Sequence, residues 1–270
     1  MLNEMEKVAR RAILAAGEII RETIGHVADS WIQSKGPADY VTKVDQRCEL
    51  LIMEEIRRNF PDHSIMSEET ASDGLQPGYT WVIDPLDGTT NFIHGFPFVA
   101  VSIAVCEDEV PVLGLVFDPV RHELFSARKG EGAWLNGSRL RTRSDAQLEK
   151  ALIATGFPFR RKNLADAYLK AFRSIFMEVS GIRRAGAAAL DLAYLGAGRV
   201  DGFWEIGLKA WDIAAGALIV QEAGGMVSDF LGEDNHLHSG NVVSGTPAIY
   251  PFLLEQVQKW INPVLEAQER

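Results

Sequence analysis

The chain has 270 residues, 47% of them hydrophobic and 24% charged, which is typical of a globular protein with two closely packed halves and excludes disordered and fibrous classes. Its formal net charge of −10 repels polyphosphate backbones, so nucleic acid is not expected as the main ligand. Two cysteines, no cleavable N-terminal signal and no apolar run near the ~20 residues that cross a bilayer predict a cytoplasmic protein without membrane association or a disulfide framework.

The first part of the chain predicts two helices, over residues 2–25 and 45–60, because apolar residues recur there at helical spacing. The polar segment SKGPADYVTK between them predicts a loop and is a candidate mobile lid. Strands are expected at TWVI, FVAVSIAV, VPVLGLVF and ELFSARKG, and a turn at Asn136-Gly137. FVAVSIAV is apolar on both alternating faces, which predicts a central strand covered on both sides.

After about residue 150 strands and helices alternate. The expected strands are ALIATG, GIRR, VDGFWE, GMVSD and NVVSG, and the expected helices cover residues 163–178, 187–196, 211–223 and 248–261. This alternation favours helices layered on a sheet, and hence an α/β fold. We expect two halves, 1–150 (α+β) and 151–270 (α/β), that form a single compact unit with a soft boundary.

The stretch WVIDPLDGTTNF concentrates charge at the end of an apolar strand. Asp84 is expected to close the strand, because Pro85 has no backbone donor for further pairing. Asp87 precedes an expected helix start, where it would be either an N-cap or part of a metal site. Two neighbouring carboxylates raise each other's pKa unless a cation neutralises them, and their oxygens suit Mg²⁺. Together with the amides of Gly88 and Thr89 at the helix start, they indicate a phosphate site.

Other segments offer further carboxylates. Glu68 and Glu69 in SEET are candidate ligands or solvated turn residues, and Asp45 is a candidate site residue or an N-cap. Asp212 is either the first-turn acid of a buried helix or a metal ligand. Because its helix is apolar on nearly all sides, a carboxylate beside Trp211 would be partly desolvated and would need a cation.

Two separated motifs of this chain resemble those of the inositol monophosphatase family, within the magnesium-dependent, lithium-sensitive phosphatase superfamily. WVIDPLDGTTNF fits the first signature of that family and WDIAAGALIVQEAGG the second, with SEET and VTKVDQ in the expected order. GFPFRRK, IRRAGAAALDLAY and GRVDGFWEIGL resemble the bacterial branch called extragenic suppressor SuhB. The resemblance runs from about residue 5 to 262 and implies a layered α-β-α-β-α sandwich of the inositol monophosphatase and sugar phosphatase type.

The resemblance also implies metal ligands from both halves of the chain. The expected ligands of two or three Mg²⁺ ions are Glu68, Asp84, the backbone carbonyl of Leu86, Asp87 and Asp212. Lithium is expected to compete for the site formed by Asp84, Asp87 and Asp212. The family has Gly before its metal-binding Glu, where this chain has Ser67.

The remaining site residues that the resemblance implies act on water and substrate. Asp45 and Thr89, with Glu68, are expected to be catalytic by orienting the attacking water and helping to deprotonate it. The expected substrate-binding residues are Asp87, Gly88, Thr89, Ala188 and Glu205, with the Gly88 and Thr89 amides on the phosphate.

These features predict a Mg²⁺-dependent phosphomonoesterase that hydrolyses inositol 1-phosphate and related polyol or sugar phosphates by in-line attack of water. The alternative substrates are fructose 1,6-bisphosphate, NADP, histidinol phosphate and adenosine 3′,5′-bisphosphate. Glu205 favours a polyol, because a carboxylate accepts hydrogen bonds from ring hydroxyls but repels a second phosphate.

The resemblance implies a homodimer as well. For the bacterial branch it implies a second role in ribosomal RNA transcription antitermination, with Nus factors and RNA polymerase as partners. Arg183 and Arg184 lie in a segment that bears on dimer and partner contacts in this branch.

Overall fold

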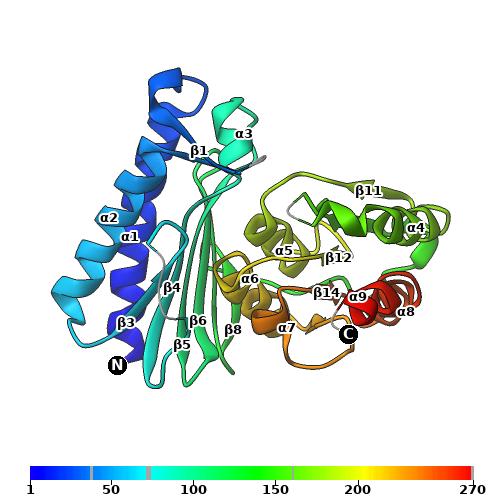
Figure 1. Ribbon diagram of the computed structural model, residues 1–270. Helices are drawn as coiled ribbons and strands as arrows, with labels where there is room; N and C mark the ends of the chain where they lie inside the picture. Colours follow the sequence, from blue (N-terminus) through cyan, green and yellow to red (C-terminus); the bar gives the residue numbers. More distant parts are fainter. Residues whose placement is uncertain (37–38, 71–73, 160, 269–270) are drawn as a thin grey trace.

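The structure is a computed structural model that describes residues 1–36, 39–70, 74–159 and 161–268. Its elements form five layers, in the order helices, seven-stranded sheet, helices, five-stranded sheet, helices (Figure 1). The described α-helices are α1 Leu2–Thr23, α2 Lys43–Asn59, α3 Thr89–Ile93, α4 Ala165–Phe176, α5 Ala188–Gly196, α6 Ala210–Glu222, α7 His236–Ser239, α8 Tyr250–Trp260 and α9 Asn262–Gln268. The predicted α/β fold and its layered arrangement are therefore confirmed.

The seven-stranded sheet has the order β3-β4-β5-β6-β7-β8-β9. Its strands are β3 Ser64–Ser67, β4 Tyr79–Asp87, β5 Ala100–Glu107, β6 Val110–Asp118, β7 Glu123–Arg128, β8 Gly132–Leu135 and β9 Ser138–Arg139. Only β3 and β4 run parallel; every other neighbouring pair is antiparallel. β5 is buried along all but its last residue, as its sequence predicts, and Asn136 and Gly137 form the expected turn with positive φ.

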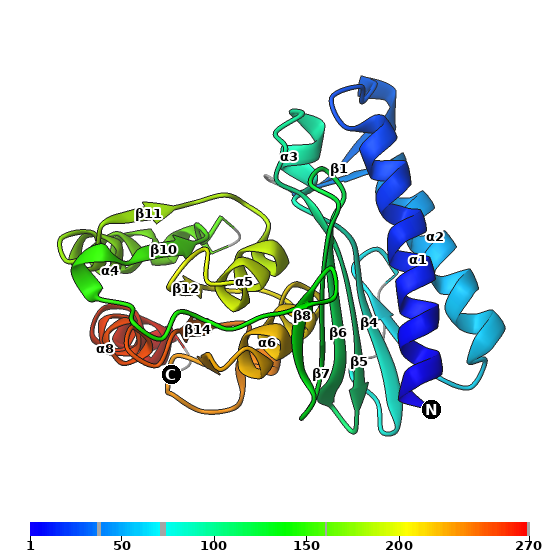
Figure 2. The ribbon, with the colours of Figure 1, turned by 180° about the vertical axis from the view of Figure 1, so that it is seen from behind.

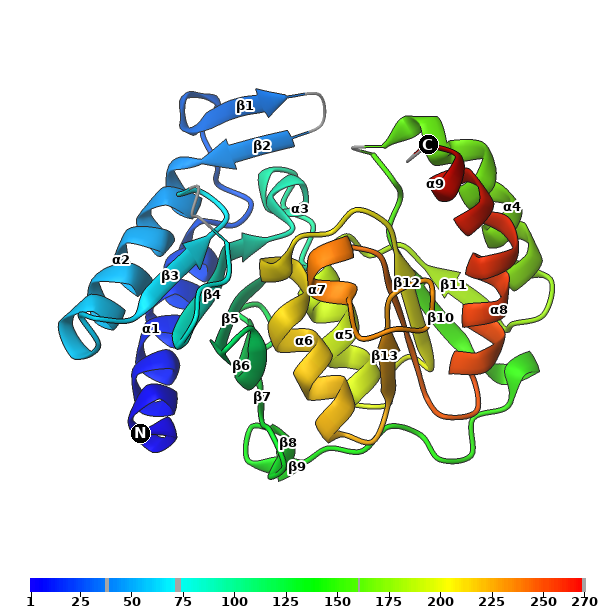
Figure 3. The ribbon, with the colours of Figure 1, turned by 60° about the horizontal axis from the view of Figure 1, so that its bottom comes forward.

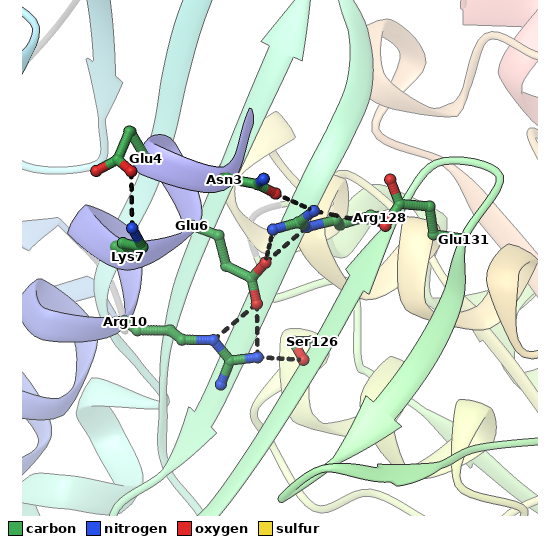
Figure 4. Close-up of polar contacts among 8 residues, drawn as sticks. All are labelled: Asn3, Glu4, Glu6, Lys7, Arg10, Ser126, Arg128 and Glu131. Atoms are coloured by element: carbon green, nitrogen blue, oxygen red, sulfur yellow. Dashed lines mark hydrogen bonds and ion pairs between the residues drawn. The ribbon is translucent and has the colours of Figure 1, made fainter. Parts of the chain in front are cut away.

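Helices α1 and α2 cover the outer face of this sheet, and α5 and α6 cover its inner face (Figure 2). The buried residues of α1 recur at intervals of three or four, so one stripe of the helix packs on α2 and the sheet. An ion pair between Glu6 and Arg128 also ties α1 to β7, and Glu6 accepts a further hydrogen bond from Arg10 of its own helix (Figure 4).

The five-stranded sheet of the second half has the order β11-β10-β12-β14-β13. Its strands are β10 Leu152–Thr155, β11 Gly181–Arg183, β12 Gly202–Glu205, β13 Met226–Ser228 and β14 Val242–Gly245. Helices α4, α8 and α9 cover its outer face, whereas α5 and α6 fill the space between the two sheets (Figure 3).

Helix α6 packs closely on the first sheet because the residues on both sides of the contact are small. A Cβ atom added at Gly114 of β6 would lie 2.8 Å from the carbonyl oxygen of Ala215. At the far end of α6 the carboxylate of Glu222 accepts hydrogen bonds from the backbone N–H groups of Gly130 and Gly132, between β7 and β8. The helix is thus fixed to the first sheet along its whole length.

Two local predictions from the sequence are wrong. The segment expected to be a loop contributes two antiparallel strands, β1 Ile32–Gly36 and β2 Asp39–Thr42, next to α3 (Figure 3). Residues 37 and 38 of the candidate lid lie outside the described residues, and its mobility stays a prediction. Asp84 does not close β4 either, because pairing with β5 resumes at Asp87 after a register shift. The physical reason is that Pro85 interrupts the ladder only locally, which makes a bulge.

None of the described helices is long and apolar enough to cross a membrane.

Candidate functional site

A cavity of about 290 Å³ opens where the end of β4 meets α5, α6 and the end of β12. Nine of the ten site residues expected from the sequence line it: Glu68, Asp84, Leu86, Asp87, Gly88, Thr89, Ala188, Glu205 and Asp212. The tenth, Asp45, lies behind the wall and contacts the cavity through Thr89. The structure therefore brings together residues that are up to 144 positions apart in the sequence, from Glu68 to Asp212.

The bulge in β4 orients the first carboxylate. Asp84 is 1% exposed, and its Oδ1 accepts a hydrogen bond from the N–H of Leu86 across 3.0 Å. Its other oxygen, Oδ2, is buried and has no hydrogen-bond partner in the part of the chain that the structure describes. Burial, and then the charges of Glu68, Asp87 and Asp212, raise the pKa of Asp84 well above its usual value. Asp84 is thus a buried carboxylate with one oxygen that has no hydrogen-bond partner among the described residues.

Asp87 links the two halves of the chain. Its Oδ2 accepts a hydrogen bond from the N–H of Ala189, at the start of α5, across 2.8 Å. Burial, and next the charge of Asp212, raise the pKa of Asp87 well above its usual value. The N-cap of α3 is Gly88, with a φ of 90°, so the interpretation of Asp87 as an N-cap is wrong. A Cβ atom at Gly88 would also lie 3.1 Å from the carbonyl oxygen of Phe98, which explains the need for glycine there.

Asp45 uses its two oxygens for two purposes. Oδ2 accepts hydrogen bonds from the backbone N–H and the hydroxyl of Thr42, the N-cap of α2, and completes a capping box. Oδ1 accepts a hydrogen bond from the hydroxyl of Thr89 across 3.0 Å. Burial is the main cause of the raised pKa of Asp45, and the hydrogen bonds from Thr42 and Thr89 act against it. The interpretation of Asp45 as the N-cap is wrong, because Thr42 is the N-cap of α2 and Asp45 is the third helical residue that completes its capping box. Its other oxygen contacts Thr89 of the site, so Asp45 reaches both the helix start and the cavity.

The second half of the chain supplies the opposite wall. Asp212 lies in the first turn of α6, where its Oδ2 accepts a hydrogen bond from the N–H of Lys209 across 2.7 Å. Glu205 ends β12 and is buried against Gly156, where a Cβ atom would lie 1.8 Å from Glu205 Oε1. Ala188 is the first residue of α5.

Several residues at the site were not expected there. Tyr40, Phe157, Phe159 and Arg184 also line the cavity. Arg184 was expected only as a partner contact, and its guanidinium stacks on the ring of Phe157, with 5.5 Å between the guanidinium carbon and the ring centroid. The aromatic residues of GFPF, in an otherwise polar connection, were the available signal for this rim.

Asp191 is a further buried acid that the sequence analysis did not single out. It lies in the apolar helix α5, and burial, followed by the charges of Glu205 and Asp87, raises its pKa well above the usual value. An aspartate inside the run AALDLAYLG was the signal in the sequence.

The chemistry of the site suits a hard divalent cation. Within the described ranges no three His, Cys, Asp or Glu side chains are arranged so that they could hold a metal ion as they stand. Burial and the neighbouring carboxylates nevertheless raise the pKa values of Asp84 and Asp87, so a cation bound between them would favour their ionised forms. The donors are all oxygens, and Asp84 Oδ2 has no partner among the described residues, which favours Mg²⁺ or Ca²⁺ over softer metals.

Comparisons with known proteins identify the family of the chain. Residues 1–262 match the family described as Inositol monophosphatase family. The Nus factor SuhB of Pseudomonas aeruginosa is 48% identical over 98% of this chain and 100% of its own length. The crystal structure of extragenic suppressor protein suhB from Bartonella henselae has a TM-score of 0.89 at 40% identity, covering 96% of this chain and 100% of that one. A structure of inositol monophosphate bound SaIMPase-II has a TM-score of 0.81 at 25% identity, covering 99% and 100%.

Proposed function

The chain belongs to the inositol monophosphatase family, a family of metal-dependent phosphatases, and from this we propose that it hydrolyses inositol 1-phosphate and related polyol or sugar phosphates with Mg²⁺. The observation that carries the proposal is the convergence of the expected residues on one cavity, with a buried carboxylate oxygen of Asp84 that has no partner among the described residues. The similar structure of SaIMPase-II, described as inositol monophosphate bound, supports the substrate class.

In this proposal the carboxylates of the cavity hold the metal ions. Glu68, Asp84 and the carbonyl of Leu86 would bind the first Mg²⁺, and Asp84 with Asp87 and Asp212 would bind the second. Glu68, with waters, would hold a weaker third ion. When bound, these ions would lower the pKa of a water molecule and neutralise charge on the phosphate oxygens.

Thr89 and Asp45 would act on the attacking water. Thr89 lines the cavity, and its hydroxyl donates a hydrogen bond to Asp45 Oδ1. As Thr89 Oγ1 accepts a proton from the water, it passes its own proton to Asp45 Oδ1. The buried position of Asp45 raises its pKa, which makes it a better proton acceptor than an exposed aspartate.

The walls of the cavity would orient the substrate. The amides of Gly88 and Thr89 are proposed to bind phosphate oxygens, while Asp87, Ala188 and Glu205 bind ring hydroxyls. The pKa values of Asp87 and Asp191 are raised in part by the charge of Glu205, so this end of the site is already rich in negative charge. A second phosphate there would be repelled, which favours inositol 1-phosphate over fructose 1,6-bisphosphate.

The test is phosphate release by the purified protein from both esters, with Mg²⁺, with chelator and with the Asp84→Asn variant. We expect Mg²⁺-dependent release that the variant loses, and a higher kcat/KM for inositol 1-phosphate. Release that survives in the variant would refute the metal assignment. A clear preference for the bisphosphate would refute the role of Glu205.

We also infer a second role, as a homodimeric Nus-like factor in ribosomal RNA transcription, because a relative named Nus factor SuhB is 48% identical over nearly the whole chain. Pull-down of purified Nus factors and RNA polymerase by the Asp84→Asn protein separates this role from catalysis. Retention of a factor by the inactive protein is expected. Absence of binding by both the variant and the wild type would remove the second role.

A further inference from the structure

Helix α2 carries two buried carboxylates that lie one turn apart. Asp45 is fully buried and Glu49 is 5% exposed. Residues four apart lie on the same face of a helix, so both acids point to the same side of α2. Asp45 contacts Thr89 of the site, whereas none of the roles proposed above involves Glu49.

Both oxygens of Glu49 are used on one residue. Glu49 Oε1 accepts a hydrogen bond from the backbone N–H of Thr70 across 2.9 Å, and Oε2 accepts one from the Thr70 hydroxyl across 3.0 Å. Thr70 is itself exposed, so a buried carboxylate reaches a surface segment. Hydrogen bonds to a charged acceptor are stronger than neutral ones, and two of them fix orientation as well as position.

Thr70 stands two residues after Glu68, the proposed metal ligand. On the other side of Glu68, Ser67 ends β3 and pairs with Ile83, and the N–H of Glu68 donates to the carbonyl oxygen of Ile83 across 3.2 Å. The backbone on both sides of Glu68 is therefore fixed: before it by pairing of β3 with β4, and after it by the hydrogen bonds from Thr70 to Glu49. Among the described contacts of Thr70, only those with Glu49 fix it to another element.

We propose that Glu49 is a positioning residue for metal binding: through Thr70 it holds Glu68 at the cavity. This inference rests on the proposed function, in which Glu68 is a ligand. Groups that orient ligands in this way contribute to metal affinity without touching the metal. Two acids on one face of α2 would then have different roles: Asp45 would accept a proton from the attacking water through Thr89, and Glu49 would position the metal ligand Glu68.

The experiment measures Mg²⁺ binding by calorimetry without substrate. In Glu49→Ala we expect Mg²⁺ affinity to fall by about 10- to 100-fold, as for other groups that orient metal ligands. At saturating Mg²⁺, kcat should stay close to that of the wild type. Glu49→Gln should rescue, because its amide oxygen accepts from the Thr70 N–H and its amide nitrogen donates to the Thr70 hydroxyl. Thr70→Ser should also bind Mg²⁺ as the wild type does, whereas Thr70→Val should weaken binding.

Ile52→Ala is the matched control, because Ile52 is buried on the same helix and contributes to the core. It should lower the Tm without changing Mg²⁺ affinity. Equal losses of affinity in Ile52→Ala and Glu49→Ala at similar loss of Tm would overturn the proposal, and so would wild-type affinity in Glu49→Ala.

Amide hydrogen exchange of residues 67–70 in chelator distinguishes this proposal from the proposed function. Exchange should be faster in Glu49→Ala than in the wild type or Glu49→Gln. If the wild type binds no Mg²⁺ and releases no phosphate, the proposed function fails. If exchange is the same in all three proteins, the anchoring by Glu49 fails.

Discussion

Thr89 Oγ1 donates a hydrogen bond to Asp45 Oδ1 across 3.0 Å, and this bond joins the first turn of α3 to the first turn of α2. Because proton transfer by a positioned side chain is typically worth about 10²- to 10⁴-fold in rate, Thr89→Val should lower kcat by roughly that factor. Thr89→Ser keeps the hydroxyl and should retain most activity. The check is steady-state kinetics at saturating Mg²⁺, and a Val variant as active as the Ser variant would exclude the relay.

Asp84→Asn should make the protein inactive and, in chelator, more stable. The substitution removes a buried negative charge that burial and three nearby carboxylates disfavour. Each kcal/mol added to the free energy of unfolding raises the Tm by roughly 2 to 4 °C in a protein of this size. Thermal unfolding in chelator measures this, with Asp118→Asn, which breaks an ion pair with Arg121, as a control expected to lower the Tm. A lower Tm for Asp84→Asn would mean that its carboxylate is stabilised without metal.

The stabilisation by Mg²⁺ should grow with pH. The folded-state pKa values of Asp84 and Asp87 are raised above the usual value of about 4, so the folded chain binds protons more tightly than the unfolded chain. Stability in chelator contributed by these groups is therefore present at low pH and lost as pH rises through the raised values. A cation favours the ionised form instead. The difference in Tm between Mg²⁺ and chelator should be larger at pH 8 than at pH 5, and the opposite trend would contradict these pKa directions.

His63 should make stability depend on pH at a distance from the cavity. Its Nδ1 accepts a hydrogen bond from Trp81 Nε1 across 3.0 Å, which requires the neutral ring, and burial lowers its pKa. Because the pKa of His63 is lower in the folded than in the unfolded chain, the neutral ring stabilises the fold at pH values above the unfolded pKa of about 6.5. This contribution is lost as the pH falls through the lowered folded-state pKa.

The matched variant is His63→Phe, which keeps the ring stacked between Phe60 and Tyr79 but cannot accept the bond. The wild type should exceed it in free energy of unfolding by about 1 kcal/mol at pH 8, the usual net value of one hydrogen bond, and by less at pH 5. Chemical denaturation at both pH values provides the comparison. A constant difference would show that His63 does not titrate in this range.

Structural features that depend on residues close together in the sequence could be predicted, whereas features that depend on contacts between distant segments could not. The helices and most strands follow from periodicity, and the motif around Asp84 predicts the acidic end of β4. The pairing of Asp87 with Ala100 beyond the bulge could not be predicted, because it depends on a neighbouring strand. For the same reason the short polar strands β1 and β2 were expected as a loop. Helices α7 and α9 were missed because they are too short to show a helical period.

In the site too, single residues could be predicted from the sequence, but the contacts between them could not. Its acids were identified as candidates one by one, because an aspartate beside an apolar run is visible in a sequence. The bonds from Thr70 to Glu49, and from Ala189 to Asp87, join segments 21 and 102 positions apart, and no spacing rule connects them.

The close packing of α6 on the first sheet has a consequence for biosynthesis. A chain emerging from the ribosome completes the strands of the seven-stranded sheet first, with α1 and α2 available to cover one face. The other face stays bare until α5 and α6 have emerged, and the same event delivers Asp212 to the cavity and Glu222 to its two glycine amides. Phosphatase activity would thus appear only in chains that have also buried the apolar inner face of the first sheet, which is a surface of the kind through which nascent chains aggregate.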